Sequence, residues 1–339
     1  MKIETLSPVH VGDGDKYTAM DFVVKNGRVV FLDVLKVLQE LDRRGEDVMK
    51  LAEDIGSRWR SIGDVLDDVY EFKQKEAKFI GDENGTATGK EIIKHIQSGG
   101  RLYIPGSSIK GAIRTALLWK AVKDDRNLLD WTIQYIKRER RFDLKKIDDK
   151  LEAKVFRSSK QLNKDDPKND MLRALRITDT THFTKSTVYE VKFVNMRGFT
   201  VLAECIDAGD SADVEVDIDE YTLRVLGERL DFDDIKEATK EFAGEIVKTE
   251  MRRGYPERTK NEFKNVLRSK GLLLRTGWGV GWYSTTIGTL LSTHPDFEGI
   301  RRKLRLGRRP RGKGISRNFP VTRRITWDDK PLGWVAIQE

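Results

Sequence analysis

The chain has 339 residues, of which 38% are hydrophobic and 35% charged, and its formal net charge is +8. This length allows two ordinary domains, each with its own core. No window approaches the roughly 20 apolar residues that a membrane-spanning helix needs, and the N-terminus lacks a signal-peptide core, so we expect a soluble, cytoplasmic protein. A single cysteine, Cys205, excludes an internal disulfide, and the four scattered histidines offer no spacing for a zinc site, so we expect neither a metal nor a cofactor.

The first elements are a strand, a hairpin and a helix. The segment "KIETLSPVHVG" at 2–12 predicts a short strand that carries Ile3, Leu6 and Val9. It precedes the segment "DFVVKNGRVVFLD", in which the pair Asn26-Gly27 is a strong hairpin signal. Residues 33–43 carry apolar side chains at helical spacing behind Asp33, which is a typical N-cap. The pattern then predicts a mostly helical insertion over residues 46–98, broken by a loop at 81–89.

Residues 101–125 predict a strand, a Pro-Gly turn and a helix whose N-cap is Ser107 or Ser108. The free amides and the positive dipole end of a helix N-terminus attract anions, and Gly106 permits close approach. Lys110 and Arg114, one turn apart, would extend such an anion site along the helix.

Two other interpretations of this helix start are a nucleotide P-loop and an ordinary capped helix. It is not a nucleotide P-loop, because Ala112 stands where that motif needs a lysine. The alternative to an anion site is a capped helix whose Gly111 permits close packing.

The rest of the chain alternates runs of strands with a few helices. Residues 124–170 are charged and poorly patterned, which indicates a second insertion or a mobile loop. Strand patterns follow at 172–180, 188–196, 199–206 and 213–223, and helical patterns at 232–250 and 257–269. This order favours an α+β fold, with units at 1–123 and 171–339 on either side of the 124–170 segment.

A glycine-rich segment, "RTGWGVGWYSTTIG" at 275–288, follows the apolar run 272–274. It is not a dinucleotide fingerprint, because the next required glycine is absent and "WYSTTIG" has a strand pattern where a helix is needed. Arg275 is then available for phosphate, and Trp278 and Trp282 for base stacking, as suits single-stranded RNA. The alternative is a buried aromatic pair, since alternation places both tryptophans on one face.

Charge is segregated along the chain. Residues 301–313 hold eight Lys or Arg and no acid, whereas residues 207–234 hold eleven acids against two arginines. One surface should therefore attract polyanions and another repel them. Within the basic run Arg308, Arg309 and Arg311 are candidate RNA contacts, and the alternative for the run is a solvated tail.

His10 lies near Asp13 and Asp15. A histidine beside carboxylates can act as general acid or base for 2'-OH attack on phosphate, as in metal-independent ribonucleases. The alternatives are a structural or a phosphate-contacting histidine. No Ser/His/Asp or Cys/His arrangement follows from the spacing.

Four segments together resemble the RAMP superfamily of CRISPR-associated proteins, and within it the family of fifth Csm subunits of type III-A effector complexes. These segments are "LSPVHVGDGDKY" at 6–17, "YIPGSSIKGAIRTAL" at 103–117, "LRITDT" at 175–180 and "LLRTGWGVGW" at 273–282. The resemblance implies tandem ferredoxin-like (RRM-like) domains with helical insertions and a glycine-rich loop near the C-terminus.

The resemblance also implies a function. Such a subunit is non-catalytic, caps the head of the Csm complex at the 3' end of the crRNA, and supports crRNA maturation and antiviral RNA targeting. Its expected partners are crRNA and the other Csm subunits, especially the backbone RAMP subunit, with host nucleases trimming the crRNA. Asp13, Asp15 and Asp21 lie where the backbone subunit has its cleaving aspartate, but without a matching context. The alternative function is a metal-independent CRISPR RNA-processing endonuclease that uses His10.

The family's RNA-facing positions correspond to eleven residues here, to which Trp278 and the three basic-run arginines are added from the residue patterns. The eleven are His10, Gly12, Gly106, Ser107, Ser108, Lys110, Gly111, Arg114, Arg275, Gly277 and Gly279.

Overall fold

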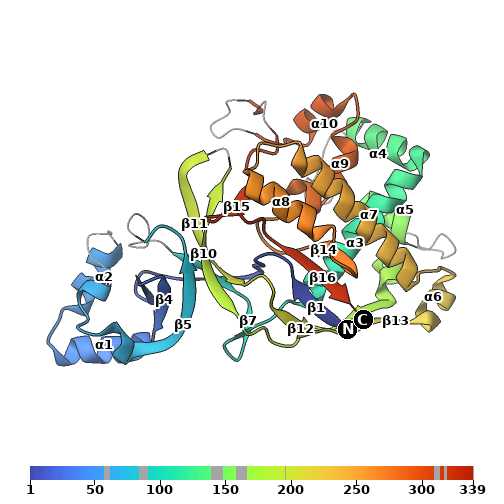
Figure 1. The fold of residues 1–339 in the computed structure, drawn as a ribbon. Helices are drawn as coiled ribbons and strands as arrows, with labels where there is room; N and C mark the ends of the chain where they lie inside the picture. Colours follow the sequence, from blue (N-terminus) through green and yellow to red (C-terminus); the bar gives the residue numbers. More distant parts are fainter. Residues whose placement is uncertain are drawn as a thin grey trace.

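The computed structural model describes residues 1–56, 62–83, 91–138, 148–157, 166–194, 196–308, 314–316 and 319–338. These residues form two main sheets with helices packed against them, as Figure 1 shows. The predicted α+β fold class is therefore confirmed. Within the described residues, no helix is long and apolar enough to cross a bilayer.

The smaller sheet joins the two ends of the chain. Its strands lie in the order β12 (Ser211–Asp213), β1 (Lys2–Thr5), β16 (Trp334–Gln338) and β14 (Leu272–Arg275). Because β1 pairs with β16, the N- and C-termini lie side by side (Figure 1). The long helices α3 (Gly106–Asp124) and α7 (Phe232–Met251) pack on this sheet and on each other, which forms the largest apolar core.

The larger sheet is mixed and follows the order β2-β6-β11-β10-β5-β4-β3, with β15 paired to β10. Its strands are β2 (Gly12–Tyr17), β3 (Phe22–Lys25), β4 (Arg28–Leu32), β5 (Lys73–Ile80), β6 (Ile92–His95), β10 (Ser186–Phe193), β11 (Met196–Ile206) and β15 (Arg324–Thr326). Val9 and Ile206 exchange two main-chain hydrogen bonds of 3.0 and 2.9 Å, so the segment after β1 ties the end of β11 to the smaller sheet.

Local signals predicted several elements correctly. Asn26 and Gly27 adopt φ of 53° and 72° between β3 and β4, which is the hairpin that this pair favours. Asp33 caps α1 (Val34–Arg43) by accepting the amide of Lys36. The helices expected near 232–250 and 257–269 are α7 and α8 (Glu257–Val266).

The expectation of a mostly helical segment at 46–98 is wrong beyond Phe72. Helix α2 (Val48–Gly56) and the 3-10 turns η1 (Ile62–Asp64) and η2 (Val69–Phe72) are present, but β5, β6 and β7 (Gln97–Ser98) follow. The sequence "KQKEAKFI" of β5 consists largely of helix formers. Pairing with β4 on one side and β10 on the other overrides that preference.

The segment 124–170 is not a simple loop. It contains α4 (Arg126–Arg138) and α5 (Asp149–Phe156), whose Ile133, Ile136 and Phe156 are buried in the main core. The helical spacing of Leu129, Ile133 and Ile136 was a signal for α4 that the prediction missed, whereas half of the residues in α5 are charged. Residues 139–147 and 158–165 lie outside the described residues.

The end of the glycine-rich segment is not a strand. Residues 282–291 form η5 (Trp282–Ser284) and α9 (Gly288–Leu291), because Gly277, Gly279 and Gly281 adopt φ of 89°, 87° and 83° and turn the chain. The part of 213–223 that was expected to continue as a strand similarly ends in α6 (Glu220–Leu226).

The domain limits stay a prediction. Each sheet nevertheless draws strands from both predicted units: β1 lies beside β16, and β5 beside β10.

Candidate nucleic-acid interface

Main-chain hydrogen bonds bring distant segments together around residues 276–281, here called the glycine loop. The amide of Trp278 donates to the carbonyl of His10 at 2.7 Å. The hydroxyl of Thr276 donates to the carbonyl of Ser108 at 3.1 Å, near the start of α3. The glycine loop therefore contacts both other glycine-containing motifs.

Close approach explains why two loop positions need glycine. A Cβ on Gly277 would lie 2.3 Å from the carbonyl oxygen of His10, and one on Gly279 would lie 2.7 Å from Leu332. Both residues also have positive φ, which L side chains rarely adopt. Gly277 therefore lets the loop lie directly against the N-terminal segment, and Gly279 lets it lie against Leu332 before β16.

The glycine loop keeps unpaired donors. In the part of the chain that the structure describes, the amides of Gly277, Gly279 and Gly281 donate to no acceptor. All three residues are half-buried, so the loop is neither sealed in the core nor fully solvated. Unpaired amides beside an open surface are suited to oxygen atoms of a phosphate.

The start of α3 is more enclosed than the sequence suggested. The N-cap is Pro105, not Ser107 or Ser108, and the amide of Gly106 donates to the carboxylate of Asp179 at 2.8 Å. Gly106 is buried, since a Cβ there would lie 2.4 Å from the carbonyl of Ile177. Asp179 thus occupies part of the predicted anion site, and Ser107 remains exposed beside it.

The two predicted cations of α3 have partners within the chain. Lys110 donates to the carbonyl of Leu175 at 2.7 Å, and burial lowers its pKa. Arg114 lies between two carboxylates, with Nε 2.8 Å from Glu152 and Nη2 2.7 Å from Asp170. The charge of Arg114 is therefore already compensated.

Gly111 does not serve close packing. It is exposed, and no atom lies within 4 Å of a Cβ built there. The packing alternative for this glycine is wrong, whereas an RNA contact stays a prediction.

The structure does not leave Arg275 available for phosphate. Its side chain is 2% exposed and lies between the rings of Phe263 and Trp334. Its Nε donates to the carbonyl of Leu332 at 3.0 Å, and its Nη1 lies 3.6 Å from Glu250. Arg275 therefore anchors β14 and the segment before β16 from inside the fold.

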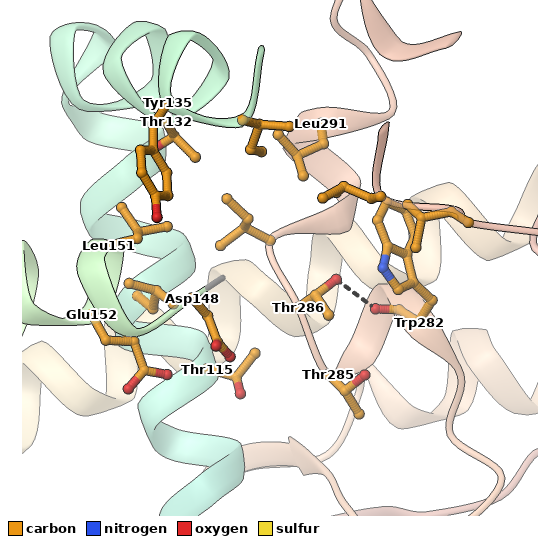
Figure 2. A pocket seen from close by; sticks show the side chains of 15 residues that line it. Thr115, Thr132, Tyr135, Asp148, Leu151, Glu152, Trp282, Thr285, Thr286 and Leu291 are labelled. Atoms are coloured by element: carbon orange, nitrogen blue, oxygen red, sulfur yellow. Dashed lines mark hydrogen bonds between the residues drawn. The ribbon is translucent and has the colours of Figure 1, made fainter. Parts of the chain in front are cut away.

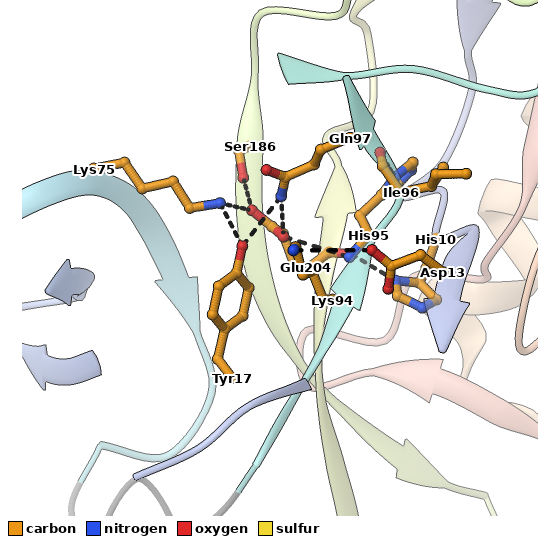
Figure 3. A network of polar contacts seen from close by, with 10 residues as sticks. All are labelled: His10, Asp13, Tyr17, Lys75, Lys94, His95, Ile96, Gln97, Ser186 and Glu204. Carbon is orange, nitrogen blue, oxygen red and sulfur yellow. Dashed lines mark hydrogen bonds and ion pairs between the residues drawn. The ribbon is translucent and has the colours of Figure 1, made fainter. Parts of the chain in front are cut away.

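The ring of His10 is also inside the fold, as Figure 3 shows. It is 2% exposed, and its Nδ1 donates to the carbonyl of Glu204 at 2.7 Å. Burial lowers the pKa of His10 and lowers that of the neighbouring His95 to about 4, so both are neutral at pH 7. A ring so enclosed is badly placed to take a proton from a ribose hydroxyl, and its contacts favour the structural alternative.

Figure 3 centres on Glu204, a carboxylate with no exposed surface. It accepts from Nζ of Lys75 at 2.7 Å and from Nε2 of Gln97 at 2.8 Å. Burial lowers the pKa of Lys75, but the ion pair with Glu204 outweighs this and raises it overall. Sequence reasoning missed this network, although a glutamate inside the apolar pattern of residues 199–206 was a signal for it.

The arginines of the basic run at 301–313 lie in different environments. Arg308 is exposed and pairs through its backbone with Ile315, whereas Arg309 and Arg311 lie outside the described residues. The basic run is not a solvated tail throughout, because Arg301 in α10 (Phe297–Lys303) is 3% exposed and lies over the ring of Phe319.

The two tryptophans of the glycine-rich segment have different neighbours. Trp282 packs against Phe297 and Phe319, whereas Trp278 contacts His10.

A cavity of about 300 Å³ lies between α3, α4, α5 and the segment 282–291 (Figure 2). Leucine and isoleucine side chains form much of its wall, and the hydroxyls of Thr115, Thr132 and Thr286 donate to main-chain carbonyls. Its polar edge carries Asp148 and Glu152, whose charge repels phosphate.

Among the described residues, no group of three or more His, Cys, Asp or Glu is arranged to hold a metal ion.

Comparisons with known proteins match this chain along its length. The Csm5 protein of the CRISPR system of Methanocaldococcus jannaschii is 22% identical over 99% of this chain and 88% of its own. A chain in a cryo-EM structure of a type III-A Csm-crRNA-target RNA ternary complex has a TM-score of 0.82 and 28% identity, with 99% of both chains covered. The crystal structure of Csm5 from T. onnurineus has a TM-score of 0.77 and 25% identity, covering 99% of this chain and 100% of the other.

The RAMP superfamily is matched over residues 2–284, a range that contains the N-terminal motif at 6–17, the start of α3 and the glycine loop. Domains of this superfamily are ferredoxin-like, in agreement with the expected fold. On this match, the chain belongs to the RAMP superfamily.

Proposed function

We propose that this chain is the Csm5-type subunit of a type III-A CRISPR effector complex and that it binds crRNA without cutting it. The observation that supports this most strongly is the similarity to Csm5 proteins and to a chain of the Csm-crRNA-target RNA complex over almost the entire chain. The proposal includes a position at the head of the complex, on the 3' side of the crRNA, with a supporting role in crRNA maturation.

The RNA-facing surface in this proposal is the glycine loop with its surroundings. Gly12, Ser107 and Gly111 are exposed, and Gly277, Trp278 and Gly279 are half-buried with unpaired amides at the two glycines. Phosphate oxygens accept from such amides without any sequence preference, as a subunit that holds many different crRNAs requires. Lys110 adds a positive charge three residues after Ser107 in α3.

The binding role is tested by crosslinking crRNA to the assembled complex and mapping the attached peptides. We expect attachment within residues 103–117 and 273–283. Attachment confined to other parts of the chain, such as α1 and α2, would contradict the proposed surface.

The non-catalytic role is supported by the burial of His10 and His95. The purified chain, incubated with repeat-containing RNA in EDTA, is expected to leave the RNA intact. Cleavage that disappears in His10→Ala would instead establish the endonuclease alternative.

A further inference from the structure

Arg324, the first residue of β15, lies against the glycine loop. Its guanidinium carbon is 4.8 Å from the ring centre of Trp278 and 5.1 Å from that of Phe193. A Cβ built on Gly279 would lie 3.7 Å from Cδ of Arg324. Two aromatic rings therefore fix the guanidinium next to the unpaired amides of the loop.

The charge of Arg324 has no counterion within the described residues. In the part of the chain that the structure describes, no carboxylate lies within 4 Å of Arg324 and no acceptor is hydrogen-bonded to it, in contrast to Arg114, Arg253 and Arg275. Its Nε is buried without an acceptor among the described residues, and the residue as a whole is half-buried. Burial alone accounts for the lowered pKa of this guanidinium. Leaving a half-buried charge unpaired is costly, and a ligand anion would remove that cost.

We propose that Arg324 is the cation of the glycine loop and binds a phosphate group of the RNA together with the loop amides. This inference rests on the proposed crRNA-binding function and identifies a residue that the sequence motifs did not single out. Trp278 then acts by positioning the guanidinium, since one face of its ring is already occupied by Arg324. The rigid fork of an arginine matches two phosphate oxygens, which a lysine does not.

The competing explanation is that Arg324 only holds Trp278 and Phe193 together through cation–π contacts. The two explanations differ in a measurable way. A packing role changes stability alone, whereas a phosphate contact changes RNA affinity and its dependence on salt.

The experiment titrates the full chain with a labelled single-stranded RNA of mixed sequence over a range of salt concentrations. The variants are Arg324→Gln and Arg324→Lys. The control is Arg323→Gln, which alters the adjacent arginine. Its guanidinium carbon lies 4.9 Å from the ring centre of Tyr255, and its Nε and Nη1 are buried without an acceptor among the described residues. Thermal unfolding of each variant is measured in parallel.

We expect Arg324→Gln to weaken RNA binding by about tenfold and to reduce the log-log salt slope by about 0.7, the value for one phosphate of a single strand. Arg324→Lys should keep the slope and lose severalfold in affinity, because it retains the charge without the fork. Arg323→Gln should bind like the wild type.

Equal affinities of Arg324→Gln, Arg323→Gln and the wild type would overturn the inference and leave the proposed function intact. If Arg324→Gln does not fold, wild-type affinity in Arg324→Lys would overturn it instead. A wild-type chain that binds no RNA would contradict the proposed function itself, and the inference with it.

Discussion

At the scale of single residues, burial decides what an ionisable group does. His10, Arg275 and Glu204 each have a side chain typical of functional sites, but all are enclosed and bonded to groups of the chain itself. Arg324 is the opposite case, because rings rather than carboxylates surround it. For a charged residue, the surroundings are thus more informative than the residue type.

His95 makes the stability of the protein depend on pH. Its pKa is about 4 in the folded chain and about 6.5 when unfolded, so protons bind the unfolded chain more tightly. The contribution of neutral His95 to the free energy of unfolding, about 3 kcal/mol, is complete above about pH 6.5. It is lost as the pH falls towards 4. Urea unfolding of the wild type and of His95→Gln at a series of pH values measures it. We expect the free energy of unfolding to change less with pH in the variant than in the wild type. Parallel curves for the two proteins would show that His95 does not cause the pH dependence.

At the scale of elements, glycines that look alike in sequence have different tasks. In the glycine loop, Gly277→Ala places a Cβ 2.3 Å from the carbonyl of His10, whereas Gly281 has equally positive φ but no atom within 4 Å. Gly281, at φ of 83° and ψ of 168°, lies in a backbone region that only glycine adopts readily, so Gly281→Ala should cost about 1 to 3 kcal/mol from backbone strain alone. Gly277→Ala should cost about 3 kcal/mol or more, since the loop must also leave the N-terminal segment. Chemical denaturation measures the free energy of unfolding of both variants. Similar losses of stability would mean that the close contact with His10 adds nothing to the cost of Gly277→Ala.

Helix α3 offers a second matched pair. Gly106→Ala meets the carbonyls of Ile177 and Thr178 at 2.4 and 2.6 Å, and we expect a loss of about 1 to 3 kcal/mol from overpacking. Gly111→Ala, on the exposed side of the same helix, should stabilise the protein by about 0.5 to 1 kcal/mol, because alanine is the better helix former. Thermal unfolding measures both. A destabilised Gly111→Ala would indicate a contact that the structure does not contain.

At the scale of the whole molecule, the C-terminal strand completes a sheet that begins at the N-terminus. Strand β16 lies between β1 and β14, so its removal leaves β14 without a partner strand and β1 paired only with the short strand β12. We expect a chain that ends at residue 332 not to fold, as seen by circular dichroism and rapid proteolysis. Opening the peripheral β3–β4 hairpin with Gly27→Val, at φ of 72°, is the control and should leave the core protected. A truncated chain that resists proteolysis as well as the wild type does would show that the smaller sheet is stable without β16.

Local sequence patterns were enough to predict the features that depend on near neighbours: the Asn26-Gly27 hairpin, the Asp33 cap and the long helices after residue 231. These features follow from backbone conformations that few residue types adopt. Contacts between distant segments are needed to explain why β5 is a strand, why Asp179 accepts from the first amide of α3 and why Arg275 is enclosed. The same holds for Arg324, which has no counterion among the described residues. The reason is physical: pairing, burial and charge compensation depend on groups that lie far away in the chain, and these are side by side only after folding.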